Sequence, residues 1–134
     1  MKKSKNKALV VLVIALVVVL LASFAAQAFN TSGYSVSVSR IYFDTEHGTL
    51  SGLLYMPKGV SGSNPAPTLV TTHGYLNSAE MQDANAIEMS RRGVVVLALD
   101  QYDHGHSRAT EENSNWMAFW TNSQYDAVNY MYCL

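Results

Sequence analysis

The sequence of 134 residues carries nine Lys or Arg and ten Asp or Glu, which gives a formal net charge of −1. This length allows one small domain. The near-neutral mixture of charges, with no basic stripe in the body of the chain, argues against nucleic acid as a partner. The single cysteine, Cys133, excludes an internal disulfide and a zinc site made of cysteines.

The N-terminal segment predicts a membrane anchor or a secretory signal. Residues 1–7 carry four lysines, and residues 8–29 are apolar with Gln27 as the strong polar interruption. About 20 apolar residues suffice to cross the hydrocarbon core, so residues 8–29 favour a transmembrane anchor. A small-x-small stretch also fits a signal peptide, so secretion after cleavage near Ala28 is the alternative. In both cases we expect a cytoplasmic basic head and an extracytoplasmic domain over residues 30–134.

A β-hairpin is expected at the start of the domain. Residues 34–43 alternate between apolar side chains and Ser or Arg, a period of two that is typical of a half-buried strand. Residues 44–48 form a polar turn, and residues 50–56 form the second strand. Residues 59–67 are rich in Gly, Ser, Asn and Pro, which predicts a loop.

A strand, a helix and a second strand follow over residues 68–100. The short apolar run at 68–72 predicts a buried strand, and a helix is expected from Asn77 or Ser78 to a C-cap at Gly93. Residues 94–99 have no polar member, as in strands of a parallel sheet that is covered on both faces. We interpret this stretch as a βαβ unit with a right-handed crossover.

Two polar turns should then meet at one rim of the sheet. The first is His73-Gly74-Tyr75, and the second covers residues 100–107, which include His104 and His106. Ligands of open α/β sheets bind beyond the carboxyl ends of the strands. This rim is therefore the predicted location of a functional site.

The last part of the chain predicts a loop and a final helix. Residues 109–115 are polar, and apolar and aromatic residues recur after them, so a helix is expected from about Asn122. A further parallel strand would follow in a doubly wound pattern. We therefore expect residues 30–134 to be the incomplete N-terminal portion of a larger domain.

At these residues the chain resembles the N-terminal part of the α/β-hydrolase fold family. A hairpin precedes a strand that ends in His-Gly, a helix, and a strand that ends in D-x-x-x-H-G-x-S, here Asp100 to Ser107. Tyr102 and Asp103 stand where the family often has Arg and Gly. The resemblance covers about residues 36–134 and implies an α/β fold with a mostly parallel sheet.

The resemblance implies hydrolysis of ester or amide bonds by a serine nucleophile, with no metal or cofactor. The family places this serine on a G-x-S-x-G turn after the next strand, with an acid and a histidine later in the chain. No G-x-S-x-G is present, so the nucleophile is expected beyond residue 134. Ser107 lies too far past its strand to fill that role. The implied substrate is a small ester or amide, a lipid or a peptide.

One catalytic role is predicted within the chain. Acyl transfer needs backbone N–H donors for the oxyanion, and the family takes one donor from the loop after the third strand. Here that donor is the backbone of Tyr75, supported by His73 and Gly74, because Gly74 has no Cβ and permits a close approach. The Tyr75 side chain either offers its hydroxyl or is a surface aromatic. His73 and Asp100 are expected to hold their turns.

Two alternatives come from the same residues. Asp103, His104 and His106 are metal-ligand types, so a metal-dependent hydrolase is possible if His47 or His73 lies near them. The other alternative is a non-catalytic, membrane-anchored binding module or remnant, whose open sheet edge would need a partner.

Overall fold

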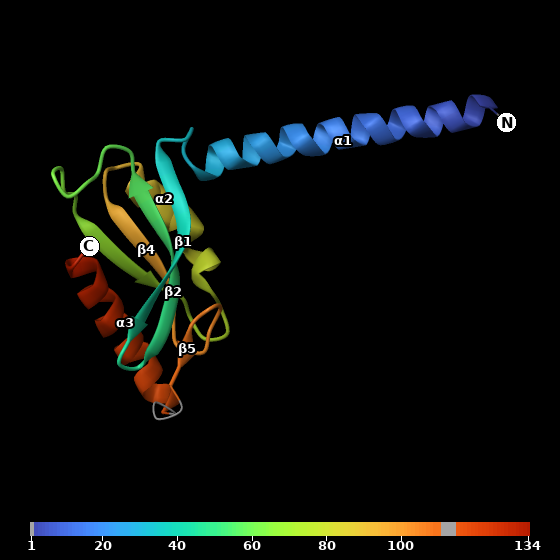
Figure 1. The fold of residues 1–134 in the computed structure, drawn as a ribbon. Helices are drawn as coiled ribbons and strands as arrows, with labels where there is room; N and C mark the ends of the chain where they lie inside the picture. Colours follow the sequence, from blue (N-terminus) through green and yellow to red (C-terminus); the bar gives the residue numbers. More distant parts are fainter. Residues whose placement is uncertain (1, 111–114) are drawn as a thin grey trace.

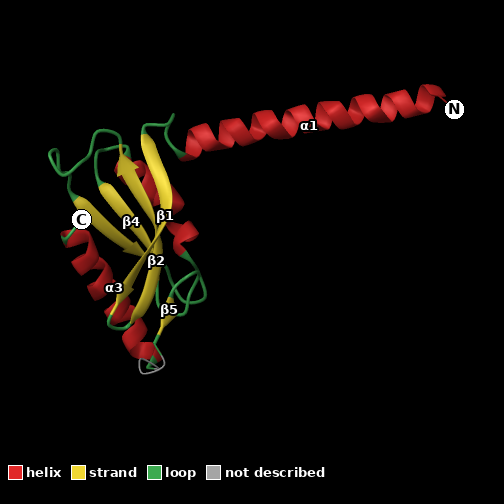
Figure 2. Cartoon of the chain, viewed as in Figure 1, coloured by secondary structure: helices red, strands yellow, loops and turns green. Residues whose placement is uncertain are grey.

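The computed structural model describes residues 2–110 and 115–134, so part of the polar loop predicted at 109–115 lies outside the described residues. A long helix projects from a body in which helices lie on both faces of a sheet (Figures 1 and 2). In chain order the elements are α1 (Lys2–Asn30), β1 (Val36–Thr45), β2 (Gly48–Pro57), β3 (Thr68–Thr72), the 3₁₀ helix η1 (Ala79–Gln82), α2 (Asp83–Ser90), β4 (Val95–Asp100), β5 (Arg108–Ala109) and α3 (Trp116–Tyr132).

Helix α1 stands apart from the body. Its segment Asn6–Asn30 is long and apolar enough to cross a membrane by length and composition, and its most apolar window is fully exposed. A signal sequence near an N-terminus has the same properties. The division into a basic head at 1–7 and a span at 8–29 stays a prediction.

The sheet is mixed, with the order β1-β2-β4-β3 and the short β5 paired to the start of β2. β1 with β2 and β2 with β4 are antiparallel, and β3 with β4 is the parallel pair. The expectation of a mostly parallel sheet is therefore wrong. The apolar run of β4 reports burial on both faces, which helices provide whatever the direction of the neighbouring strands.

The predicted hairpin is confirmed, but β1 does not bury one face along its whole length. Val36 belongs to the cluster under α2, whereas Phe43, with the partly buried Ile41 beside it, belongs to the cluster under α3. Successive side chains of a strand point to opposite faces, so the even and odd positions serve different layers. The apolar pattern changes from even to odd numbers at Arg40, the position at which β1 contributes an ion pair instead.

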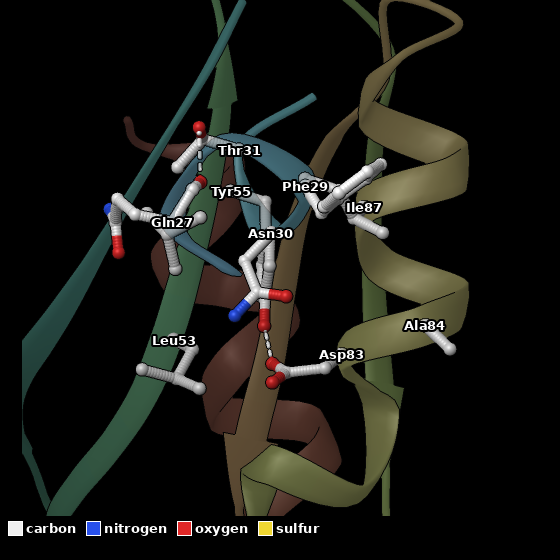
Figure 3. A pocket seen from close by; sticks show the side chains of 10 residues that line it. Gln27, Phe29, Asn30, Thr31, Leu53, Tyr55, Asp83, Ala84 and Ile87 are labelled. Atoms are coloured by element: carbon white, nitrogen blue, oxygen red, sulfur yellow. Dashed lines mark hydrogen bonds between the residues drawn. The ribbon is translucent and has the colours of Figure 1, made fainter. Parts of the chain in front are cut away.

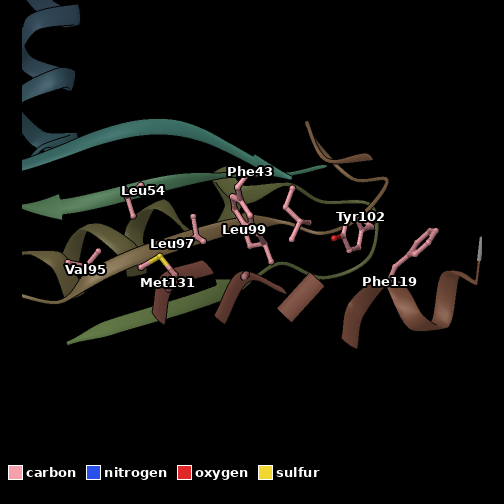
Figure 4. Packing of buried hydrophobic residues seen from close by; sticks show 10 residues of the cluster. Phe43, Leu54, Val95, Leu97, Leu99, Tyr102, Phe119 and Met131 are labelled. Atoms are coloured by element: carbon pink, nitrogen blue, oxygen red, sulfur yellow. The ribbon is translucent and has the colours of Figure 1, made fainter. Parts of the chain in front are cut away.

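Two apolar clusters hold the layers together. The larger one lies between the sheet and α3 and includes Leu97 and Leu99 of β4 and Phe119 and Met131 of α3 (Figure 4). The smaller one lies between the sheet and α2 and includes Val96 and Ala98. All six residues of β4 are buried, as predicted for the central strand.

The predicted βαβ unit is confirmed, with three differences in its helices. The crossover begins as the 3₁₀ helix η1, and Ser78 at its N-cap makes no side-chain capping bond. Gly93 ends the helical segment at φ +88° as expected of a C-cap glycine. The final helix begins at Trp116, earlier than the expected Asn122, because the Asn115 side chain accepts from the Met117 N–H and caps it.

Candidate functional site

The two predicted turns lie together at the carboxyl ends of β3 and β4. The Gln101 backbone N–H donates to His73 Nε2 at 3.2 Å, which joins one turn to the other. The rings of His73 and His104 lie 5.2 Å apart between centroids, and the Tyr75 ring lies 6.0 Å from that of His104. The parallel pairing of β3 with β4 therefore gathers these residues at one rim.

His73 holds the first turn through both ring nitrogens. Its Nε2 accepts from Gln101, so in the neutral ring the proton is on Nδ1, which donates to the Gly74 carbonyl at 2.7 Å. The side chain is buried, with an exposed fraction of 5%. A histidine with both nitrogens engaged in this way positions the backbone of Gly74 and Tyr75 and has no nitrogen left for proton transfer.

The residues after His73 are exposed and carry few bonds. The Asn77 N–H donates to the Gly74 carbonyl at 3.3 Å, which closes a turn over Tyr75 and Leu76. Among the described residues no hydrogen bond engages the Tyr75 N–H. A Cβ added at Gly74 would meet only the Asn77 side chain, at 4.0 Å. The role of Tyr75 as an oxyanion donor stays a prediction, which this geometry permits.

Asp100 organises the second turn. Its buried carboxylate accepts from the backbone N–H of Ala79 at 2.7 Å and of His106 at 3.1 Å. Arg40 Nη1 donates to the same carboxylate at 2.8 Å, and Arg40 also pairs with Glu80. Asp100 therefore connects β4, η1, β1 and its own turn, so the deep burial of its charge is compensated by a cation and two N–H donors.

Ser107 and Gly105 complete this turn. The Ser107 hydroxyl is fully buried, donates to the Asp100 carbonyl at 2.7 Å and accepts from the Ser51 N–H at 2.8 Å. Gly105 has φ +50°, and a Cβ there would lie 2.3 Å from Asp100 Oδ1. The family-like motif of this turn is thus explained by packing, and Ser107 has neither the exposure nor the position of a nucleophile.

The alternative metal site is not formed. His104 Nδ1 bonds the Tyr102 carbonyl at 2.9 Å, whereas the His106 ring lies against Tyr42. The Asp103 carboxylate accepts from the Ala109 N–H. In the described part of the chain no group of three or more His, Cys, Asp or Glu side chains could hold a metal ion.

A polar network under the hairpin was not predicted. Asp126 of α3 accepts from the Tyr102 hydroxyl at 2.7 Å and pairs with His47 Nδ1 at 2.8 Å. Burial raises the pKa of Tyr102 above its ordinary range, and the nearby Asp126 carboxylate raises it further. His47 and Asp126 are 79 positions apart in the sequence, so no local pattern reveals their contact.

A pocket of about 450 Å³ lies between the end of α1, the hairpin and α2 (Figure 3). Asn30 and Thr31 line it from one side, and Leu53 and Tyr55 from another. The Tyr55 hydroxyl donates to Asp83, and burial raises the pKa of that carboxyl. The pocket joins α1 to the α2 side of the sheet, at the end opposite the rim.

Comparisons with known proteins identify the fold. No protein-family model matches the chain, and the search of curated proteins found no significant match. The solved structure described as "Thioesterase Domain From Curacin Biosynthetic Pathway" matches with a TM-score of 0.54 and 18% identity over 71% of this chain. The chain spans 33% of that chain. At this identity the match shows an α/β-hydrolase-like fold and nothing of the chemistry.

Proposed function

We propose that this chain is the N-terminal part of a membrane-anchored or exported hydrolase that cleaves acyl bonds with a serine outside residues 1–134. The observation that carries the proposal is the sheet order β1-β2-β4-β3, with His73-Gly74-Tyr75 at the carboxyl end of the edge strand β3. The likeness to the thioesterase domain supports the same fold.

The edge of β3 supplies the geometric argument. Among the described residues β3 pairs only with β4, so its outer edge is open. Helix α3 contacts both strands on one face and is placed as a crossover toward that edge. A parallel strand added there would end beside His73 and Tyr75. A serine in the turn after such a strand would face the exposed Tyr75 N–H.

The turn at His73 fits the second part of the mechanism. When a serine attacks an ester, amide or thioester carbonyl, negative charge develops on the carbonyl oxygen and needs donors that are already in place. The two bonds of His73 fix the backbone on either side of Gly74. The Tyr75 N–H would then be one oxyanion donor, and the residue after the serine would supply the other.

The location belongs to the same proposal. Residues 8–29 would cross the membrane with the basic head in the cytoplasm and the domain outside it, or would direct secretion by cleavage near Ala28. The substrate would be a small ester or amide, a lipid or a peptide of the extracytoplasmic space. No metal or cofactor is required by this mechanism.

The first test is the coding sequence that follows the Leu134 codon. A strand followed by G-x-S-x-G and by a later acid and histidine is the expected result. The longer protein should then react with a fluorophosphonate probe, and replacement of the new serine by alanine should abolish the labelling. An immediate stop codon would overturn catalysis by this chain and leave an anchored binding module.

The oxyanion role has its own test in that longer protein. Gly74→Ala adds a methyl group that the fold accommodates but that crowds the path to the Tyr75 N–H. We expect kcat/KM to fall, with a limit near the 10²–10³-fold typical of a lost donor, and the unfolding midpoint to stay unchanged. Gly62→Ala, in an open loop, is the matched control. Equal activity of both variants would remove Tyr75 from the mechanism.

A further inference from the structure

Exposed apolar side chains surround the candidate oxyanion turn. Tyr75, Leu76 and Met81 have exposed fractions of 64%, 78% and 63%. Tyr75 and Leu76 lie in the loop after β3, and Met81 lies in η1, which follows it. Val38 and Tyr42 of β1 are also exposed on the side of the sheet that carries α2. Contiguous apolar exposure of this kind marks a contact surface.

The backbone of Leu76 supports this interpretation. Its φ is +58°, in the left-handed region that a bulky residue rarely adopts. The side chain gains no burial within the described chain in return, because it is the most exposed of the three. Unusual backbone conformations persist where a function or a contact requires them. The conformation directs an apolar side chain outward instead of hiding it.

Helix α1 indicates what covers this surface. It joins the sheet through a fixed connection, in which the buried Thr31 donates to the Gln27 carbonyl and the Val36 N–H donates to the Thr31 carbonyl. From there α1 extends toward the side of the body on which η1 and the loops after β3 and β4 lie (Figure 1). Helix α3 lies on the opposite face of the sheet.

We propose that the α2 side of the domain rests on the surface of the bilayer that α1 crosses, with Tyr75, Leu76 and Met81 in the lipid interface. Arg91 and Arg92 at the end of α2 face the same side and favour anionic head groups. This inference rests on the anchoring part of the proposed function and deepens it. The rim at His73 then opens at the membrane, and its substrates are amphiphilic acyl compounds that reside in the lipid.

The chain's single cysteine makes a direct test simple. In a Cys133→Ser background of the full chain, Leu76→Cys and Met81→Cys each carry a nitroxide spin label. The protein is reconstituted in vesicles of phosphatidylcholine and phosphatidylglycerol, and label collisions with oxygen are compared with those of a water-soluble nickel complex. Oxygen should dominate at both positions. The matched control is Val128→Cys, an exposed residue of α3 at 54%, where the nickel complex should dominate.

A label at Val17→Cys in α1 separates the possible failures. If Val17 is in lipid while Leu76 and Met81 collide mainly with nickel, the domain is anchored but does not rest on the membrane, and the inference is wrong. Labels at 76 and 81 that neither reagent reaches would show a protein partner on this surface, which also overturns it. A Val17 label outside lipid would overturn the anchoring itself, while the test by fluorophosphonate labelling would still stand.

Discussion

The two turns at the rim differ sharply in how they are held. The turn after β4 is built around the buried Asp100, which receives Arg40 and two backbone N–H groups, and Ser107 closes it from the other end. The turn after β3 has one buried side chain, His73, and then exposed backbone. Satisfied networks in a low dielectric are rigid and costly to disturb. Rigid support and an accessible donor thus lie side by side.

This difference assigns separate tasks to the two turns. The turn with the more striking motif, D-x-x-x-H-G-x-S, is a bracket that fixes β4 against η1, β1 and β2. The plainer His-Gly-Tyr turn is the one that can meet a ligand. Substitutions in the first turn should therefore unfold the domain, whereas those in the second should change activity or leave stability unaffected. Unfolding can be followed by tryptophan fluorescence, because both tryptophans lie in α3.

The largest effect is expected from Asp100→Ala. The change leaves Arg40 without its buried partner and removes the acceptor of the Ala79 and His106 N–H groups. Breaking one partner of a buried pair costs about 3–5 kcal/mol. Urea unfolding of the full chain in detergent micelles measures it. Asp103→Asn, an exposed position in the same turn, is the control and should cost little. Similar losses in both variants would contradict the bracket.

Gly105→Ala should come next. The new Cβ would lie 2.3 Å from Asp100 Oδ1, and the position has a positive φ. Overpacking together with the left-handed backbone predicts a loss of about 2–4 kcal/mol. Gly62→Ala, where nothing lies within 4 Å of the added atom, should be close to neutral. An unfolding midpoint for Gly105→Ala equal to that of Gly62→Ala would show that the turn is looser than described.

Ser107→Ala tests whether the buried hydroxyl is structural. It leaves the Ser51 N–H and the Asp100 carbonyl without a partner, which predicts a loss of about 1–3 kcal/mol. In the longer protein, fluorophosphonate labelling should persist in every molecule that remains folded. A folded Ser107→Ala variant that no longer reacts would identify Ser107 as the nucleophile and reverse the assignment of tasks.

The sequence predicted what depends on neighbours along the chain. The hairpin, the βαβ unit and the buried β4 follow from local periodicity and turn residues, and the meeting of the two turns follows from parallel pairing. The direction of β2 against β4 was missed, since burial on both faces does not depend on strand direction. The ion pair of Arg40 with Asp100 joins positions 60 apart, so no local pattern contains it.

A second aspartate shows what burial does without such partners. Burial raises the pKa of Asp83 above its ordinary 3.8, so the folded state binds the proton more tightly than the unfolded chain does. The resulting stability is present below pH 3.8 and is lost as the pH rises through the raised pKa. Asp83→Asn should lose this pH dependence, and the unfolding midpoint of the two proteins should diverge only above that window. The effect should be smaller than that of Ser107→Ala, and parallel curves would refute it.

The smallest effect is expected in the exposed turn, from Leu76→Asn. Asparagine tolerates the left-handed backbone that Leu76 adopts at φ +58°, and the leucine side chain loses no internal burial when it is replaced. Stability in detergent micelles should stay equal or rise by up to about 1 kcal/mol. Tyr42→Asn, at an exposed strand position with ordinary backbone, is the control and should not gain. A clear loss at Leu76 alone would mean that this side chain supports the fold, and the exposed turn would then be as structural as the one after β4.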